Sequence, residues 1–443
     1  MSVLPVYTED EIIANNLLGP FRFLVKLTLL DCSYKSKCIR IPAFLIALVL
    51  VVLMFLRVGG LMQTDANSLS FAWAESNFYG FVGIHAAVCS ICILGWTFNG
   101  FIPKHARKLA KVRMLRTRSN EKMDDFRRLH VLAILFSIPW LFACMAWIIF
   151  NVLKHKYLYG GDESNMILCI LFAISNFYIW LISTVSLAFY ILVFASLNRE
   201  VECFNVDFAR AKEEKSLKLL GILEKFDFRQ NQILEMILEA NGSLGSFARF
   251  APLFLFYGLV NGVYLTGFHD SVPLVYFVFC CVFLTAIIFY NLITLSPACA
   301  LQEHLAQTNR ILINNDEFEG AKDPLIYQTY RIMVDRLQKL DTRVYVMSAI
   351  PITTQTLAIA AFICPNLGML LLMVKKRCDA VKFQQKVRNA EYGPYVSEHG
   401  IPVLEDYPRG AADDFGNSDS NSISEHNFYV YISLAKLNIV KLS

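Results

Sequence analysis

Charged residues are scarce in this chain. Only 18% of its 443 residues are Asp, Glu, Lys or Arg, whereas 56% are hydrophobic and the mean hydropathy is +0.45. Soluble domains usually carry about 25% charged residues, so this chain has too few polar groups to cover its apolar surface in water. A water-soluble globular protein of ordinary composition is therefore excluded, and lipid is the expected solvent.

The chain also lacks the short motifs that mark common enzymes. No His-Glu-x-x-His, Gly-x-Ser-x-Gly, phosphate-loop Gly-x-x-x-x-Gly-Lys or dinucleotide-binding Gly-x-Gly-x-x-Gly occurs. We therefore predict that it is not an enzyme, with no catalytic residue, no metal site and no cofactor. A nucleic-acid partner is not expected either, because a basic loop beside a membrane meets anionic lipid first.

Long apolar runs are abundant. A helix needs about 20 apolar residues to cross about 30 Å of hydrocarbon, and a helix satisfies its own backbone hydrogen bonds there. Seven runs are of this kind: residues 41–58, 78–99, 129–153, 166–197, 250–268, 272–298 and 346–374. The predicted fold class is an all-α integral membrane protein with seven transmembrane helices, and the lipid bilayer is its first partner.

Polar segments flank these spans. Residues 1–40 mix basic and acidic side chains, so we expect no cleavable signal peptide of normal length, and the first span serves as the membrane-entry signal. Residues 378–443 contain clusters of Gly, Pro, Asp and Ser, which predict a mostly disordered tail. The predicted division is a cytoplasmic amino-terminal segment (1–40), a seven-span domain (41–377) and this tail.

Positive charge is missing from some loops and concentrated in others. The loop at 59–77 has no Lys or Arg, whereas residues 104–128 contain ten of them against three acidic residues. Cytoplasmic loops are enriched in Lys and Arg, so the second loop is predicted inside, the amino terminus in the cytoplasm and the carboxyl terminus outside. The cations at 375–377 then lie outside, against the rule. We give them less weight because early spans usually set the orientation.

No cysteine lies in a predicted outer loop, although the chain has twelve. We therefore expect the cysteines to be small buried apolar residues or reduced thiols, not partners in disulfides. Asp-Arg-Tyr after the third span and Asn-Pro-x-x-Tyr in the seventh are also absent. With the inverted orientation, these absences argue against the G-protein-coupled receptor fold.

Apolar residues recur at helical spacing among the charges of residues 199–249, and again in the segment that leads into the last span. This pattern predicts amphipathic helices projecting into the cytosol. Since the outer loops are short, the soluble part of the protein is expected on the cytoplasmic side.

Ionisable side chains are nearly absent from the spans, and we place His85 as the only one well within the hydrocarbon zone. It is either a ligand or gating contact or a neutral imidazole bonded to a neighbouring helix. Aromatic residues at the outer interface and deeper in the spans either line a pocket or serve as anchors and packing. The candidates for a ligand or stimulus pocket are Trp73, Asn77, His85, Trp147, Tyr178, Trp180 and Tyr264.

Polar residues and a proline interrupt the last span. Non-regular backbone at membrane depth is tolerated where it meets protein or water, so this span is predicted to line a conduction path, with an aliphatic ladder that closes by dewetting. The alternative is an ordinary Pro-kinked packing helix. The pore or gate candidates are Gln355, Pro365, Asn366, Leu367, Leu370 and Met373.

The arrangement resembles the insect gustatory and odorant receptor superfamily. The resemblance rests on seven spans with a cytoplasmic amino terminus, long inner extensions of spans four to six, and the run SPACALQEHLAQTNRIL leading through a helical hairpin to TTQTLAIAAFICPNLGMLLLMV. It covers about residues 20–377 and is nearest to the nematode branch that includes light- and peroxide-sensing members. The superfamily motif Thr-Tyr, five apolar residues, Gln-Phe is not matched at 365–373, and the tail is longer than is usual.

The resemblance implies a homotetramer, or a hetero-oligomer with related receptors, whose last helix lines a central pore and whose inner extensions pack together. We therefore expect a gustatory-type receptor in the plasma membrane of sensory neurons. It would be a cation channel gated by a small-molecule ligand or by light. The alternative is a seven-span receptor that signals through cytoplasmic partners such as G proteins without conducting ions.

Overall fold

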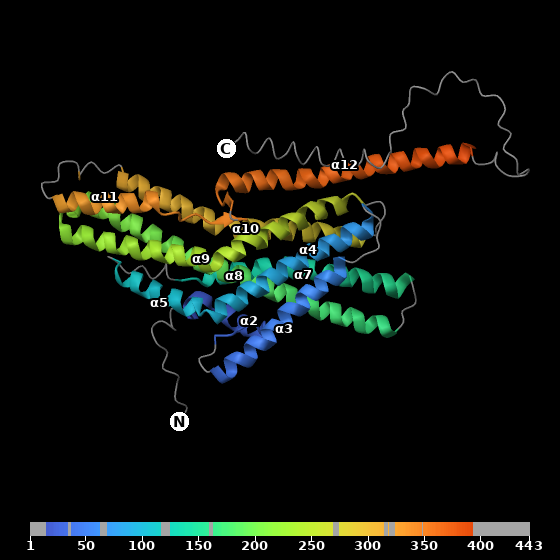
Figure 1. The fold of residues 1–443 in the computed structure, drawn as a ribbon, viewed down its shortest axis with the longest axis horizontal. Helices are drawn as coiled ribbons and strands as arrows, with labels where there is room; N and C mark the ends of the chain where they lie inside the picture. Colours follow the sequence, from blue (N-terminus) through green and yellow to red (C-terminus); the bar gives the residue numbers. More distant parts are fainter. Residues whose placement is uncertain are drawn as a thin grey trace, which may run out of the picture. The chain divides into compact units, whose positions relative to one another are not determined.

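The computed structural model describes residues 15–33, 37–62, 69–116, 125–158, 163–268, 274–313, 318, 324–347 and 349–392. Seven of the helices in these ranges are long and apolar enough to cross a membrane. They are α3 (Lys37–Met62), α4 (Phe71–Phe98), α7 (Arg127–Leu158), α8 (Glu163–Glu213), α9 (Leu220–Thr266), α10 (Leu274–Ile313) and α12 (Thr354–Tyr392). The predicted all-α, seven-helix membrane fold is confirmed (Figure 1).

Shorter elements join these helices. They are α2 (Phe21–Leu27), α5 (Phe101–Met114), the 3-10 helix η1 (Ser216–Lys218), α11 (Pro324–Lys339), and the strands β1 (Tyr345–Val346) and β2 (Ile350–Pro351). The strands pair antiparallel, with Tyr345 opposite Pro351 and Val346 opposite Ile350.

The last span begins later than its apolar run predicted. Residues 345–351 form the hairpin, and α12 begins at Thr354 rather than near residue 346. The side chain of Thr353 accepts a hydrogen bond from the backbone N–H of Thr356 at 3.2 Å, which is the geometry of a helix N-cap. Capping by Thr353 explains where the helix starts, and the apolar pattern alone carries no such signal.

Three helices continue well beyond the bilayer. α8, α9 and α10 are 51, 47 and 40 residues long, roughly twice what a crossing needs. The amphipathic helices predicted over 199–249 are thus the end of α8 and the start of α9, joined through η1. Most of their apolar positions are buried as expected: Leu217, Leu223, Phe226, Ile233, Leu234 and Ile237.

α8 is the centre of the bundle. It contacts α2, α4, α7, α9 and α10, and 83% of the residues in its most apolar stretch are buried. α4 packs between α3 and α9, and α7 packs against α8 and α10. In α12 only 11% of the corresponding stretch is buried, so this helix lies at the edge of the bundle.

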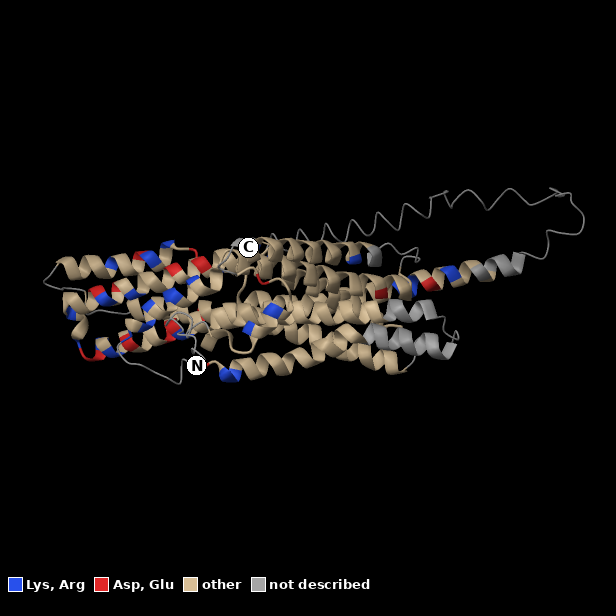
Figure 2. Ribbon diagram, turned by 90° about the horizontal axis from the view of Figure 1, so that it is seen from below, with Lys and Arg blue, Asp and Glu red and all other residues tan. Residues whose placement is uncertain are grey.

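Charged residues gather at one end of the bundle, around α5, α11 and the adjoining ends of α8 and α9 (Figure 2). Several of them pair with each other in buried positions. Arg116, two residues beyond the end of α5, contacts the fully buried carboxylate of Glu200 on α8, and Arg229 of α9 binds Asp207 of α8 at 2.6 Å. These pairs join the extensions into a compact charged bundle distinct from the apolar spans.

Candidate ligand pocket and pore helix

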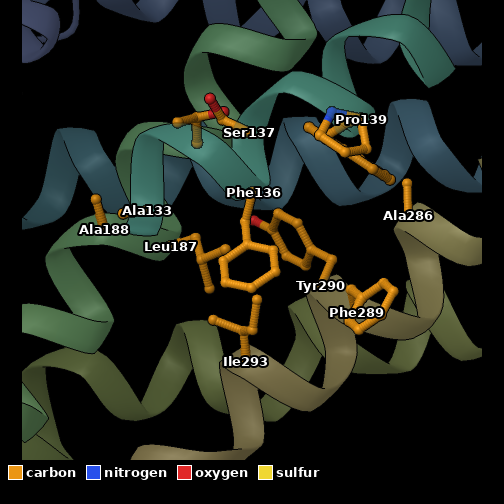
Figure 3. Close-up of a pocket in the computed structure, with 12 residues that line it drawn as sticks. Ala133, Phe136, Ser137, Pro139, Leu187, Ala188, Ala286, Phe289, Tyr290 and Ile293 are labelled. Atoms are coloured by element: carbon orange, nitrogen blue, oxygen red, sulfur yellow. The ribbon is translucent and has the colours of Figure 1, made fainter. Parts of the chain in front are cut away.

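A small cavity lies between α7, α8 and α10, with a volume of about 30 Å³. Figure 3 shows the side chains of Phe136, Tyr290 and Ile293 pointing toward one another across it. A cavity of this size holds little more than a water molecule. Its lining consists of Ala133, Phe136, Ser137, Pro139, Trp140, Thr184, Leu187, Ala188, Ala286, Phe289, Tyr290 and Ile293.

Two polar atoms of the lining have no hydrogen-bond partner in the described part of the chain. They are the indole Nε1 of Trp140 and the hydroxyl of Thr184, and both are buried. A buried donor without an acceptor costs about 1–3 kcal/mol. A hydrogen-bond acceptor placed in the cavity beside these two groups would satisfy them.

His85 lies next to this cavity. Its ring meets those of Tyr290 and Trp140 edge to face, at centroid distances of 5.2 and 6.2 Å, and Ser183 Oγ lies 3.3 Å from its Nδ1. The Tyr290 hydroxyl donates to the Ser183 carbonyl at 2.7 Å. His85 is thus fully buried in a network from α4, α8 and α10, adjoining the cavity wall without lining it.

Trp180 reaches the same wall from α8, while Tyr178 points elsewhere. The Trp180 indole donates to the carbonyl of Ser137 at 2.7 Å, and Ser137 lines the cavity. The Tyr178 hydroxyl donates to the carbonyl of Thr28 at 2.7 Å, on the far side of α8. Trp147 lies outside the described side chains.

The remaining pocket candidates form a separate, closely packed group at the start of α4. The Trp73 and Tyr264 rings meet edge to face at 6.3 Å, and the Tyr264 hydroxyl donates to the carbonyl of Leu69 at 2.6 Å. The Asn77 amide donates to the carbonyl of Trp73 one turn earlier, at 3.0 Å. These contacts fasten α4 to α9 and enclose no cavity found among the described residues.

Arg57 is a charged side chain inside a span that the sequence argument overlooked. Its guanidinium donates to Asn176 Oδ1 of α8 at 2.5 Å and lies 5.8 Å from the ring centroid of Phe172. The expectation that His85 is the only ionisable side chain well within the hydrocarbon zone stays a prediction, since Arg57 lies two residues from the end of the span Cys38–Gly59. Because Arg57 occupies the end of the run at 41–58, its position in the sequence is that of a flanking cation.

α12 touches α9 along one face only. The approach is close at Gly368, where an added Cβ would lie 2.6 Å from Val263 Cβ and 2.8 Å from the Val260 carbonyl. Near the end of this contact the Lys375 ammonium lies 3.7 Å from the ring centroid of Phe268. The helix continues through Pro365 to Tyr392, so the proline does not end it.

The pore and gate candidates lie mainly on the opposite face of α12. Asn366 is exposed and its amide donates back to the carbonyl of Phe362 at 2.6 Å; Phe362 itself is 72% exposed. The exposed candidates are Gln355, Asn366, Leu367, Leu370 and Met373, whereas Pro365 is half-buried. They form a bare stripe that is apolar except for two amide side chains.

The hairpin before α12 is tied to the extensions of α9 and α10. Asn241 of α9 and Gln302 of α10 both donate to the carbonyl of Thr342, at 2.8 and 2.9 Å. The Thr354 hydroxyl donates to Glu303 of α10 at 3.0 Å. These hydrogen bonds link α10, which carries cavity residues near its middle, to the start of α12.

Solved structures with this fold are known. The insect olfactory receptor OR5 from Machilis hrabei matches in complex with eugenol, with a TM-score of 0.62 at 11% identity, and without it, with 0.60 at 12%. Each match covers 82% of this chain and 99% of the receptor chain. The resemblance to that superfamily therefore holds at the level of the fold.

No curated protein matches the chain. A family model with the description "Caenorhabditis protein of unknown function, DUF267" matches residues 17–368, from α2 to the middle of α12. The match includes the whole cavity lining and the contact of Gly368 in α12 with α9. With more than half of its length matched, the chain belongs to the Caenorhabditis family DUF267.

Proposed function

We propose that this protein is a subunit of a ligand-gated cation channel, a chemoreceptor in the plasma membrane of sensory neurons. The observation that carries the proposal is the bare stripe of α12, on a spanning helix that touches its own bundle along one face only. A spanning helix with a bare face packs against lipid or against other helices. The stripe also carries Gln355 and Asn366, whose amides suit contact with water better than contact with lipid.

In the proposed assembly, four copies place their α12 stripes around a common axis. Gln355 and Asn366 face the ion path, and Leu367, Leu370 and Met373 form an apolar constriction that closes by dewetting. Related receptor chains in place of identical ones would give the same arrangement. The shared fold with the olfactory receptor supports this assignment.

The proposed stimulus is a small molecule in the cavity between α7, α8 and α10. The solved olfactory receptor complex contains eugenol, which supports a small-molecule ligand for this fold. Because the cavity here measures only about 30 Å³, a ligand has to displace Phe136 or Tyr290. That displacement would move α10, and through Thr342 and Glu303 the start of α12.

The proposed orientation places the charged end of the bundle in the cytoplasm, with the amino terminus inside and the carboxyl terminus outside. α5 supports it, because Lys104, Arg107 and Lys111 are exposed on this helix and cytoplasmic segments are enriched in such cations. Epitope tags at the two termini test it in intact cells. Staining of the amino-terminal tag without permeabilisation, or a glycan on Asn241, would reverse the orientation.

The experiment that tests conduction is cysteine accessibility under whole-cell recording. In a Cys378→Ser background, a charged methanethiosulfonate reagent should block the current of Asn366→Cys, because this position lies on the stripe. The matched control is Leu372→Cys, which lies on the face toward Gly267, the C-cap residue of α9. A current that responds equally in both variants, or a surface-expressed chain that never conducts, would count against the pore. The second outcome would favour signalling through cytoplasmic partners.

The ligand site is tested by Trp140→Phe, which keeps the ring and removes the unpartnered N–H. For an acceptor-bearing agonist the half-maximal concentration should rise roughly 2- to 10-fold, the net value of one hydrogen bond. Phe142→Leu, at an exposed position on the same helix, is the control. Recording responses to short-wavelength light in the same cells, with Trp73→Phe alongside, separates light from a chemical stimulus.

A further inference from the structure

A second, larger cavity opens beside α2, at the end of the bundle where α4 passes into α5. Its volume is about 300 Å³, the lower limit of ordinary ligand pockets. α2, the loop after it and the α4–α5 turn form its walls. The lining consists of Asn15, Leu18, Arg22, Val25, Lys26, Asp31, Ser33, Trp96, Thr97, Gly100, Ile102, Pro103 and Phe189.

α2 is held against the membrane-spanning part of the protein. Phe21 is fully buried in a cluster with Ala188 and Leu192 of α8, and the Thr28 carbonyl accepts the hydrogen bond from Tyr178. The loop after α2 is fixed as well, because the Thr97 hydroxyl donates to the Leu30 carbonyl at 2.9 Å. α2 therefore packs alongside α8.

The outer side of α2 mixes apolar and basic residues. Phe23 is 65% exposed, and Leu27 and Leu29 are also exposed. Arg22 and Lys26 are exposed on the same seven-residue helix and line the cavity. Exposed apolar side chains next to spanning helices meet acyl chains, while long basic side chains reach up to the headgroups.

The charges of the cavity favour an anion. Arg22 and Lys26 face a single carboxylate, Asp31, which accepts from the Ser33 backbone N–H at 3.0 Å. Arg40 is adjacent: its guanidinium donates to the Phe98 carbonyl and lies 4.4 Å from the Phe98 ring centroid. The inner wall, in contrast, is apolar and includes Leu18, Val25 and Ile102. One cavity thus offers cations at its rim and an apolar floor.

We propose that this cavity binds the headgroup of an anionic phospholipid from the leaflet at the α5 end of the bundle. The phosphate lies between Arg22 and Lys26, and the glycerol and first acyl carbons lie against Leu18, Val25 and Ile102. A lipid fits better than a soluble anion because the apolar floor and the exposed Phe23 and Leu27 can contact acyl chains, whereas a free ion makes no favourable contact with them.

The test is native mass spectrometry of the full-length protein in detergent, titrated with phosphatidylserine or phosphatidylcholine. We expect phosphatidylserine to bind more tightly. Each basic residue near a membrane surface contributes about 1 kcal/mol, so Lys26→Gln should weaken its binding about 5-fold and Arg22→Gln with Lys26→Gln about 30-fold. Asp31→Asn removes the one opposing charge and should strengthen binding by a similar 5-fold.

Two controls keep the result interpretable. Lys111→Gln removes an exposed cation of α5 outside the cavity and should leave binding unchanged. Lys26→Arg retains the charge and should bind as the wild type does, which separates charge from misfolding. Equal binding by wild type and the double glutamine variant, or by wild type and Asp31→Asn, would overturn the proposal.

The apolar floor is tested by competition. Soluble glycerophosphoserine should displace the lipid poorly, and equal displacement at equal concentration would assign the cavity to a free anion instead. None of these measurements requires an ionic current. A chain that never conducts but binds phosphatidylserine through Arg22 and Lys26 would therefore disprove the channel and leave the lipid site standing.

Discussion

α8 and α12 are both long, apolar spanning helices, yet 83% of the most apolar stretch of α8 is buried and only 11% of that of α12. In water such a difference would follow from composition, because apolar residues move inside. In a bilayer it does not, because lipid tails are as apolar as leucine side chains. Apolarity therefore shows that a helix crosses the membrane, while its neighbours are decided by shape, polar contacts and assembly.

The largest effect on stability is expected on α8, at Glu200. Glu200→Gln removes the buried carboxylate that pairs with Arg116 and Arg113, and breaking a buried ion pair costs about 3–5 kcal/mol. The free energy of unfolding in detergent measures the loss. Asp335→Asn breaks the exposed pair with Lys339 and should change stability by less than about 0.5 kcal/mol. Equal losses of stability in both variants would show that the buried ion pair on α8 contributes no more to stability than an exposed pair does.

A second effect at α8 depends on pH. His105 of α5 lies 3.0 Å from Ser196 Oγ of α8, and burial, with Arg113 and Lys108 nearby, lowers the pKa of His105 from 6.5 to about 4. The unfolded chain thus takes up a proton at higher pH than the folded chain. Stability should fall as the pH drops from about 6.5 to 4, by on the order of 3 kcal/mol in total.

The pH effect is isolated with a histidine variant. His105→Gln should flatten this part of the stability profile, measured by thermal unfolding at a series of pH values. His304→Gln on α10 removes a different histidine and should retain the slope. A profile for His105→Gln that parallels the wild type would show that the buried imidazole is not its source.

The contact of α12 with α9 should give an intermediate effect. At Gly368 a methyl group would meet Val263 and the Val260 carbonyl at less than van der Waals distance, so Gly368→Ala should cost about 1–3 kcal/mol of unfolding free energy. Gly59→Ala in α3 meets nothing within 4 Å and should be neutral or stabilising. If both variants behave alike, α12 does not pack closely on α9.

The smallest effect on the fold is expected at the bare stripe. Phe362→Ala should change the stability of the single chain by less than about 0.5 kcal/mol, because the side chain touches little of its own bundle. It should nevertheless lower the fraction of oligomer seen by light scattering after gel filtration. Leu171→Ala, at an exposed position of α8, should alter neither quantity. If Phe362→Ala leaves the fraction of oligomer unchanged, the stripe contacts lipid rather than other subunits.

Much of the fold could be predicted from the sequence because crossing a bilayer imposes a length and a composition. Each of the seven apolar runs overlaps a spanning helix, including the run that contains Pro365. The start of α12 could not be predicted, because it depends on a threonine cap and a two-residue strand pair. The continuity of α8 and α9 with the charged bundle was expected from the inner extensions of spans four to six, whereas the apolar spacing by itself indicated only amphipathic helices.

The candidate site was less accessible to sequence reasoning. His85 was notable because it is ionisable, and it does lie beside the cavity. Thr184 and Phe136, which line the cavity, are ordinary span residues whose importance comes from three helices meeting. Arg57 could have been found by asking whether a span of 26 residues, the length of α3, would enclose it. Trp140 was one of the deeper aromatic residues that could line a pocket, and it does line the cavity. Its unpartnered N–H could not be predicted, because it depends on the surrounding side chains.

The unbroken course of α8 from the cavity to the charged bundle has a mechanical consequence. At 1.5 Å per residue its 51 residues make a rod about 75 Å long. A tilt of about 5° around a point in the middle of such a rod moves each end by roughly 3 Å, about the width of a water molecule. The cavity residues Thr184, Leu187 and Ala188 lie near the middle of α8. A ligand that tilts α8 at this point would therefore displace the end of the helix that carries the ionic contacts.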